Sequence, residues 1–510
     1  MSKHYDVVVL GTSLGALSAA ALLARRSWRV LVLGQGYRPP SYVYDGVTLA
    51  RRPFTLLAHA SPAWGRILVE LAQSQTFRRR VHALDPMLQI LGARLRLDVP
   101  PDAAEFGREI DREFPEVRRV VDDLYAELAR TNATADAAFE RDVVWPPGGF
   151  WERRETSRVV ATLPHLPGDG GGDFLAEFPR NHDYRAIIEV PARFASDAEA
   201  LPPFAIARLH GAWTRGVVRL SGGEEELTEF LLERVRAYGG DARLGGRAAA
   251  IAQRGGRVTG VRIDGDDDTV GVQFVVSDLP TLELLQLAEG FAPSRRVLAA
   301  MPRLIPVAHR FVVTLAVGTR GLPSLLANES FLLPSAPLTA KDPRCPIVHL
   351  QCTRDGDTAT LVAEALLDDD ALPLEKAREA VLAVVERFLP FIEQHYLVVD
   401  SPHDGRPLWD YRSGTRKLVD RALLRAGGGS LEPEAMTPKW RPEPACLEGL
   451  GGEPLRTPLT NAFVVGRSAL PALGQEGELL AAWSASRIIT RTDRRKEKMR
   501  RDMWSKVELG

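Results

Sequence analysis

The stretch YDVVVLGTSLGALSAAALLARRSWRVLVLGQG, residues 5–36, decides the fold. Its apolar run at 7–10 is typical of a parallel strand that is buried on both faces. A turn at 11–16 leads into a segment rich in Ala and Leu, 17–26, which predicts a helix, and 29–33 predicts a second strand. This order is typical of the βαβ unit that binds dinucleotides, because the turn presents backbone N–H groups at the start of the helix.

The glycine pattern of this unit is incomplete. Glycines are expected at the first, third and sixth positions of the turn, where this chain has Gly11, Ser13 and Ala16. The acidic residue that usually ends the second strand and binds a ribose hydroxyl is replaced by Gly34, and Gln35 follows it. The pattern therefore predicts the βαβ fold more firmly than it predicts a bound nucleotide.

The composition is that of an ordinary globular protein. The chain has 510 residues, with 65 Lys and Arg against 66 Asp and Glu, so no overall basic surface exists for nucleic acid. Its three cysteines lack CxxC spacing, which favours reduced thiols over disulfides or a zinc site. At this length we expect two or three lobes rather than one core.

Neither a signal peptide nor a membrane span is predicted. The run at 7–10 is too short for the apolar core of a signal peptide, and no run of eighteen apolar residues occurs. We therefore expect a cytoplasmic protein. The basic end of the chain, 490–510, leaves two interpretations open, a solvated terminal helix or a contact with a membrane surface or a partner.

Two other stretches also leave alternatives open. The segment LPGDGGGD, residues 166–173, is either an entrance loop or lid, or a plain surface connection. The three adjacent aspartates at 266–268 tempt a metal interpretation, but at the tip of a hairpin we expect solvated turn residues. No metal site is predicted.

Two later blocks repeat features of a nucleotide-binding domain. The first is RLSGGEEEL, residues 219–227, a turn and helix followed by the strand segments VTGV and VVSD. The second is NAFVVGRSALPALGQEGELLAAWSA, residues 461–485, a strand, a turn and a helix. In this order and spacing, the three blocks resemble the phytoene desaturase and carotene isomerase family within the flavin amine oxidase superfamily. The resemblance extends from residue 5 to about residue 489.

The resemblance implies an α/β fold in which a Rossmann-like FAD-binding domain is interrupted by a mixed α+β substrate domain. It implies FAD as cofactor and a sheet that covers an apolar tunnel for a hydrophobic small molecule. The predicted segments are 1–85, 211–285 and 456–490 for the FAD-binding domain, 86–210 for an inserted helical region, 286–455 for the substrate domain and 491–510 for a basic C-terminal helix.

The resemblance also assigns cofactor-binding residues. The first turn would cradle the pyrophosphate, a strand of the middle block would flank the adenosine, and the PGxGxxGA stretch, here residues 471–478, would lie near the flavin ring. The predicted residues are Gly11, Ser13, Leu14, Gly15, Gly34, Gln35, Ala248, Gly466, Gly474, Gln475 and Gly477.

Several positions depart from the family pattern. Gly34 replaces the acid, residues 35–41 lack the GGR motif, and Ala472 replaces a glycine. Loss of a charged hydrogen bond to the ribose alone costs about 1.5–3 kcal/mol. Three functions therefore stay open: an FAD-dependent oxidoreductase that transfers hydride to or from an isoprenoid-like substrate, a flavin-less scaffold or binding protein, and a flavin amine or porphyrinogen oxidase. No catalytic residue is assigned, because hydride transfer to a flavin needs no fixed catalytic triad.

Overall fold

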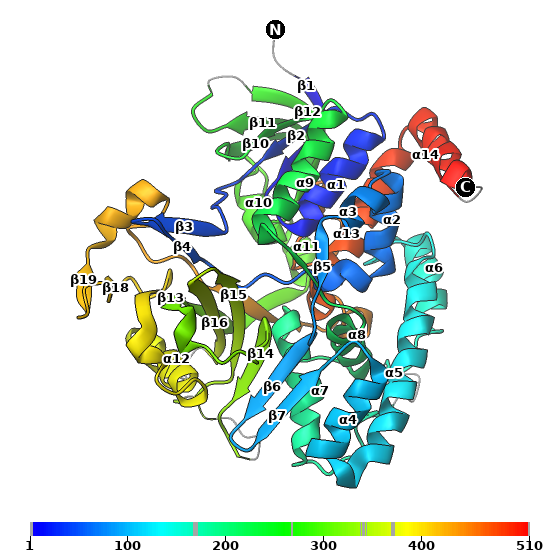
Figure 1. Cartoon of the computed structure of the whole chain (residues 1–510). Helices are drawn as coiled ribbons and strands as arrows, with labels where there is room; N and C mark the ends of the chain where they lie inside the picture. The colour runs from blue at the N-terminus through cyan, green and yellow to red at the C-terminus, as the bar shows by residue number, and fades with distance from the viewer. Residues whose placement is uncertain are drawn as a thin grey trace.

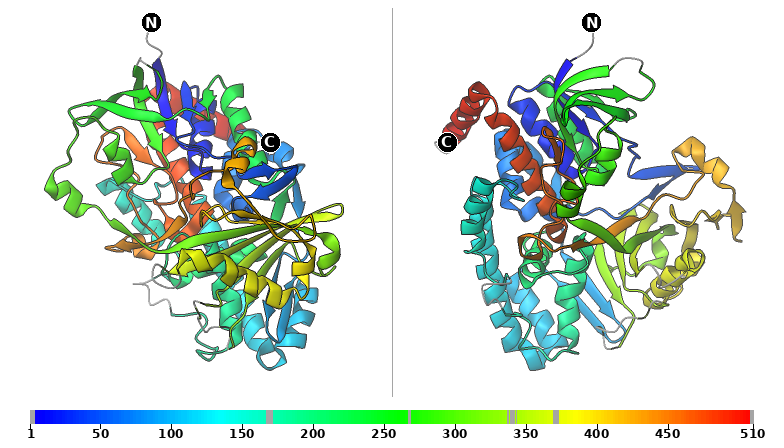
Figure 2. Two further views of the ribbon diagram at one scale, coloured as in Figure 1. Left: turned by 90° about the vertical axis from the view of Figure 1, so that its left-hand side faces the viewer. Right: turned by 180° about the vertical axis from the view of Figure 1, so that it is seen from behind.

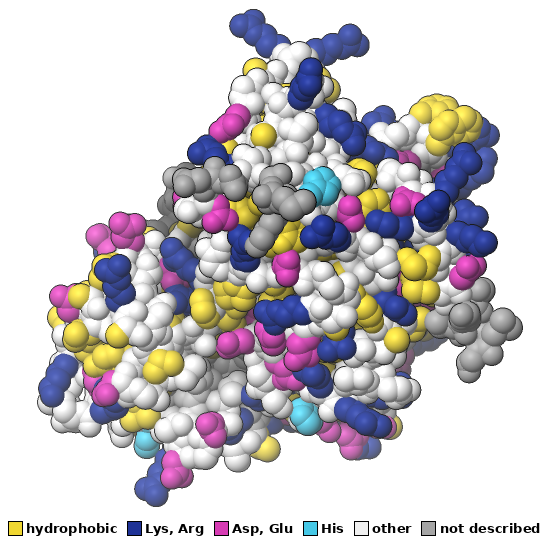
Figure 3. Space-filling model, turned by 90° about the horizontal axis from the view of Figure 1, so that it is seen from above, with side chains coloured by type: hydrophobic (Ala, Val, Ile, Leu, Met, Phe, Trp, Pro, Cys, Tyr) yellow, Lys and Arg dark blue, Asp and Glu magenta, His cyan; other side chains and the backbone are white. Residues whose placement is uncertain are grey.

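The computed structural model describes residues 4–166, 172–266, 269–336, 338, 342, 344–368 and 373–507, with the backbone alone for 505–507. Figure 1 shows an upper lobe around the N-terminal strands and a lower lobe of a second sheet and a group of helices. Most of the glycine-rich segment at 166–173, and two of the three aspartates at 266–268, lie outside the described residues. Viewed from above, charged side chains of both signs are spread over the surface (Figure 3).

The upper lobe contains the dinucleotide-binding sheet. Its strand order is β10-β11-β12-β1-β2-β9, and β21 pairs with β12. Strand β1 runs parallel to β2 and to β12, so segments more than 200 residues apart share one sheet, as predicted. The strands are β1 (His4–Leu10), β2 (Val30–Leu33), β9 (Asp241–Arg243), β10 (Ala248–Arg254), β11 (Arg257–Ile263), β12 (Thr269–Ser277) and β21 (Ala462–Val464).

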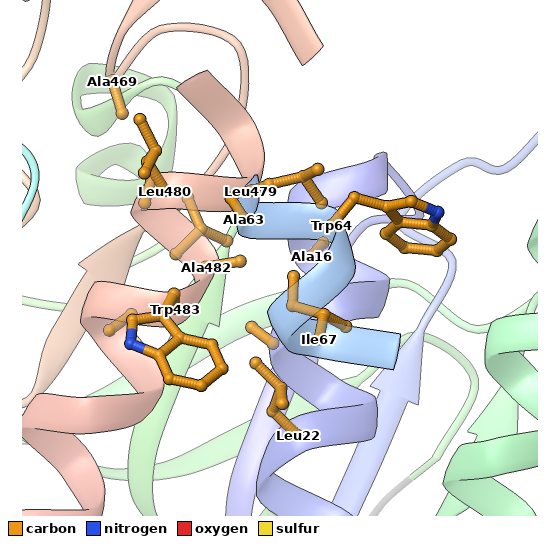
Figure 4. Packing of buried hydrophobic residues seen from close by; sticks show 14 of the residues in the cluster. Ala16, Leu22, Ala63, Trp64, Ile67, Ala469, Leu479, Leu480, Ala482 and Trp483 are labelled. Atoms are coloured by element: carbon orange, nitrogen blue, oxygen red, sulfur yellow. The ribbon is translucent and has the colours of Figure 1, made fainter. Parts of the chain in front are cut away.

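Helices α1 (Leu14–Arg25), α9 (Gly223–Ala237), α13 (Gly474–Arg491) and α2 (Pro62–Glu70) pack together beside this sheet. Small side chains let α1 and α13 approach closely, with Ala16 of α1 and Ala482 of α13 fully buried (Figure 4). Trp64 of α2 and Trp483 of α13 fill the space beside them.

The lower lobe contains a larger, mainly antiparallel sheet. Its order is β19-β18-β17-β13-β16-β15-β14-β6-β7, β20 also pairs with β13, and α12 (Leu374–Phe388) packs on it. The strands are β6 (Leu88–Gly92), β7 (Leu95–Val99), β13 (Arg303–Gly318), β14 (Glu329–Leu333), β15 (Val348–Asp355), β16 (Thr358–Asp368), β17 (Tyr396–Asp400), β18 (Leu408–Asp410), β19 (Lys417–Val419) and β20 (Thr437–Glu443).

A helical layer lies at the other side of the lower lobe (Figures 1 and 2). The helical stretch that follows residue 101 is divided at Pro115, because Phe114 leaves the helical conformation. The helices are α4 (Ala103–Glu113), α5 (Arg118–Phe139), α6 (Phe150–Val160), α7 (Asp183–Ala195) and α8 (Pro203–Thr214).

Short elements connect the lobes. A hairpin around Asp45-Gly46 consists of β3 (Ser41–Tyr44) and β4 (Val47–Ala50). A small two-stranded sheet joins β5 (Val81–Ala83) to β8 (Val218–Leu220). The remaining helices are α3 (Ser74–Arg78), α10 (Thr281–Gln286), α11 (Arg295–Ala300), α14 (Arg494–Val507) and the 3-10 turns η1 (Leu57–Ala60), η2 (Pro115–Val117), η3 (Thr319–Gly321), η4 (Ile392–His395), η5 (Arg421–Gly427), η6 (Leu447–Gly449) and η7 (Pro471–Leu473).

Among the helices that the structure describes, none is both long and apolar enough to cross a lipid bilayer. The three cysteines are free thiols, as predicted.

Candidate functional site: the dinucleotide cradle

The predicted cradle lies at the carboxyl end of β1, where the chain turns into α1. Gly11 has a φ of +103°, a conformation that a side chain would strain, and its N–H donates to the Leu33 carbonyl at 2.8 Å. Ser13 caps α1, since its hydroxyl accepts a hydrogen bond from the Ala16 N–H at 3.2 Å. The backbone therefore has the geometry of an anion-binding turn, even though Ser13 replaces the expected glycine.

An aspartate of the chain itself occupies this turn. Asp278 follows β12, and its carboxylate accepts a hydrogen bond from the Ser13 N–H at 2.9 Å. A Cβ atom placed on Gly11 would overlap this carboxylate, so Asp278 fills the space that the glycine leaves free. Burial raises the pKa of the Asp278 carboxyl to about 6, while hydrogen bonds from Ser13 and Thr12 lower it.

A glutamate binds a second amide of the turn, that of Gly15. Glu478 lies in the first turns of α13, is 6% exposed, and accepts a hydrogen bond from the Gly15 N–H at 3.0 Å. Burial raises the pKa of the Glu478 carboxyl to about 7, against the lowering effects of the Gly15 N–H and the Arg467 guanidinium. Glu478 stands where the PGxGxxGA pattern has alanine, so the substitution brings a carboxyl group to the cradle.

At the end of β2, the backbone of Leu244 fills the space beside Gly34. A Cβ atom on Gly34 would overlap the Leu244 carbonyl, which leaves no room for the acidic side chain usual at this position. The side-chain carbonyl of Gln35 accepts a hydrogen bond from the Ala248 N–H at 2.9 Å. Gln35 and Ala248, both predicted to bind the cofactor, are thus bound to each other.

Side-chain contacts with other parts of the chain also fix the start of α13. The Gln475 side chain donates to the Thr55 carbonyl at 2.9 Å and accepts from the Ala58 N–H at 3.1 Å. Next to it, Glu476 forms a buried ion pair with Arg208 and accepts a hydrogen bond from the Ser61 hydroxyl at 2.7 Å. These contacts tie α13 to the segment 55–61.

The structure places the predicted residues in three groups. Gly11, Ser13, Leu14, Gly15 and Gly466 gather around the Asp278 and Glu478 carboxyl groups, with Gly466 directly against the Asp278 backbone. A second group, at the end of β2 and the start of β10, consists of Gly34, Gln35 and Ala248. The others, at the start of α13, are Gly474, Gln475 and Gly477.

The prediction missed Asp278 and Glu478. The sequence offered a signal for each: Asp278 is the acid that ends the VVSD segment, and Glu478 is an acid at the position where the motif has alanine. Within the described residues, no group of three His, Cys, Asp or Glu side chains is arranged to hold a metal ion.

These contacts test directly whether the cradle can bind FAD. Its pyrophosphate would need the amides of the turn, and the amides of Ser13 and Gly15 already donate to carboxyl groups. Those carboxyl groups occupy the space over Gly11 and beside α1, and they carry negative charge in their ionised forms. As arranged here, the side chains of the cradle do not fit an FAD pyrophosphate.

A cavity of about 320 Å³ lies between the lobes, and its lining includes neither Asp278 nor Glu478 of the cradle. An ion pair between Arg52 and Glu224, with two N–O distances of 2.7 Å, lies at its wall. On the sheet side, buried Glu329 accepts hydrogen bonds from Thr55 at 2.6 Å and Gln351 at 2.8 Å. The walls thus mix charged, polar and apolar groups, unlike the apolar tunnel that the resemblance implied.

Comparison with known proteins supports the fold. No protein-family model and no curated protein sequence matches this chain. Among solved structures, an oxidoreductase from Methanosarcina mazei has a TM-score of 0.54 at 17% identity, over 94% of this chain and 99% of that one. A triple mutant of putrescine oxidase has a TM-score of 0.56 at 15% identity, over 96% and 100% of the two chains.

Cyclohexylamine oxidase from Brevibacterium oxydans has a TM-score of 0.54 at 14% identity, over 96% of this chain and 99% of that one. The predicted fold is confirmed. It is the two-domain, amine-oxidase-like fold, the architecture from which FAD was predicted. The similarity to amine oxidases does not show that this chain belongs to the phytoene desaturase subfamily. Membership of that subfamily stays a prediction.

Proposed function

We propose that this chain uses the amine-oxidase-like fold as a binding protein and works without FAD. The observation that carries the proposal is the pair of hydrogen bonds from the Ser13 and Gly15 amides to Asp278 and Glu478. These two donors belong to the turn that would hold a pyrophosphate, and the chain satisfies them itself.

A pyrophosphate would compete with the carboxyl groups of Asp278 and Glu478 for the same backbone amides. An incoming pyrophosphate must break both hydrogen bonds, and each buried carboxyl left without a donor costs about 1–3 kcal/mol. Two unit charges 4 Å apart near a protein surface also repel by about 4 kcal/mol. Four kcal/mol alone is roughly a thousandfold loss of affinity. Missing ribose recognition at Gly34 adds to this loss.

The cavity between the lobes supplies the binding site in this proposal. Its volume of about 320 Å³ is at the lower end for small-molecule sites. Arg52 and Glu224 offer charge of both signs at its wall, and Phe54 and Leu56 offer apolar surface. A small molecule with an apolar body and a polar or charged group matches these walls.

A second candidate is an FAD-dependent oxidoreductase, and the fold shared with the amine oxidases favours it. It requires that Asp278 and Glu478 leave the cradle when the cofactor binds. Its substrate would be an amine, as the names of two similar structures indicate for those enzymes, an isoprenoid-like molecule or a porphyrinogen.

Ligand screening by thermal shift tests the binding proposal. We expect small amphiphilic molecules to raise the melting temperature of the wild-type protein, and Ala50→Trp, which fills the cavity, to abolish the shift. Ala60→Trp, outside the cavity lining, is the control for the added indole. A melting temperature that rises with FAD instead would favour the oxidoreductase.

A further inference from the structure

Two helices far apart in the sequence border one edge of the molecule. Helices α6 and α14 both lie at the right in Figure 1 and at the left in the reversed view of Figure 2. Asp142, in the segment before α6, pairs with Arg487 of α13 at 3.1 Å and with Arg500 of α14 at 3.0 Å. Arg487 also lies 3.9 Å from Glu155 of α6. The outward faces of α6 and α14 therefore flank the end of α13.

Helix α6 presents two aromatic rings to solvent. Phe150 is 73% exposed and Trp151 is 68% exposed. Their rings pack edge to face, with a distance of 5.4 Å between the ring centroids. Two exposed aromatic rings in contact form a small continuous apolar patch, a feature found at interaction sites. The other exposed residues of this helix are Arg153, Arg154, Glu155, Ser157 and Arg158. The Arg154 guanidinium lies 5.8 Å from the centre of the Trp151 ring, and within the described residues none of the three arginines forms an ion pair.

Helix α14 presents cations on its outer face. Its inner face is fixed to the protein: Lys496 lies 3.6 Å from the centre of the Trp28 ring, and Trp504 packs on Trp483. The exposed residues described on this helix are Arg494, Arg495, Lys498, Arg501 and Asp502, and Arg491 is exposed at the end of α13. Two of these arginines lie near an acid: Arg501 pairs with Glu497 at 3.2 Å, and Arg491 lies 4.0 Å from the same carboxylate. Figure 3 shows Lys and Arg side chains along the edge of the molecule on the side of α14.

We infer that the faces of α6 and α14 form a docking surface for an anionic phospholipid membrane. Aromatic rings beside arginines suit the boundary between head groups and acyl chains, where an amphipathic ring has its polar edge in water. Clustered Lys and Arg side chains are attracted to anionic lipid head groups. A nucleic acid is a poorer match, because the overall charge of the chain is close to zero.

Vesicle sedimentation tests this surface with the full-length protein. We expect binding to vesicles of phosphatidylcholine and phosphatidylserine, weak binding to phosphatidylcholine alone, and release as the salt concentration rises. The triple variant Arg494→Gln/Arg495→Gln/Lys498→Gln should reduce the bound fraction roughly tenfold or more. Phe150→Ala/Trp151→Ala should reduce it in the same direction without changing the salt dependence.

Matched controls lie elsewhere on the protein. Arg295→Gln/Arg296→Gln/Arg303→Gln removes three exposed charges, and Leu418→Ala/Leu423→Ala removes two apolar side chains that are each 65% exposed. These variants should bind vesicles as the wild type does. Equal binding to both kinds of vesicle, losses as large in the controls, or charge-dependent binding to nucleic acid alone would overturn the inference.

Discussion

The carboxyl group of Glu478 accepts a hydrogen bond from the backbone N–H of Gly15 at 3.0 Å, across 463 residues of sequence. This contact joins the last block of the dinucleotide-binding domain to the first. It takes place at the turn whose amides make the fold suitable for a pyrophosphate. Because Asp278 accepts a hydrogen bond from the Ser13 amide of the same turn, the cradle is filled by the protein's own side chains.

Removal of the two carboxyl groups should open the cradle. In Asp278→Asn/Glu478→Ala, the first change keeps the shape of the side chain and the second restores the motif alanine. We expect the affinity for ADP, measured by calorimetry, to rise at least roughly tenfold, because the charge repulsion is gone.

Glu453→Gln is the matched control for this double variant. Glu453 is also buried, and it accepts a hydrogen bond from the Thr281 N–H at 3.0 Å outside the turn. It should leave ADP affinity unchanged. An equal affinity of wild type and double variant would show that the carboxyl groups do not block the cradle.

Stability should depend on pH through the same groups. The pKa values of Asp278 and Glu478 are raised by burial from 3.8 to about 6 and from 4.5 to about 7. The folded protein therefore holds these protons where the unfolded chain has lost them, so stability falls as pH rises from about 4 to 7.

The isosteric variant Asp278→Asn/Glu478→Gln should lack this dependence. Its free energy of unfolding in urea, relative to the wild type, should increase by about 3 kcal/mol between about pH 5 and pH 7.5. Parallel curves for the two proteins would show that these carboxyl groups titrate normally.

Restoring the missing acid should not restore ribose binding. In Gly34→Glu the new Cβ atom overlaps the Leu244 carbonyl, so we expect a loss of about 2 kcal/mol or more in the free energy of unfolding. Gly245→Glu is the control, because a Cβ atom there meets nothing within 4 Å. A stable Gly34→Glu protein with gained FAD affinity would contradict the closed geometry.

Sequence patterns were sufficient for the parts of the fold that depend on nearby residues. The apolar strand at 7–10 and the Ala-rich helix after it follow from local periodicity, and the hairpin at Asp45-Gly46 follows from its turn residues. Pro115 likewise marks the break between α4 and α5. The order of the three blocks was enough to predict that one sheet joins them.

The cradle itself depends on contacts that no local pattern contains. Ser13 and Gly34 showed that the nucleotide pattern was incomplete, but not what replaces the nucleotide. Asp278 meets Ser13 across 265 residues, and only the parallel pairing of β1 and β12 brings them together. The same holds for Gly34, whose clash partner Leu244 follows β9.

The flavin content of the purified full-length protein tests the central claim most directly. Absorbance between about 350 and 500 nm, and flavin fluorescence after denaturation, measure cofactor that copurifies or is added back; flavins carry this chromophore in every protein. The filled cradle predicts no flavin band, and no retention of FAD after incubation and gel filtration. One equivalent of FAD per chain, retained through purification, would contradict it.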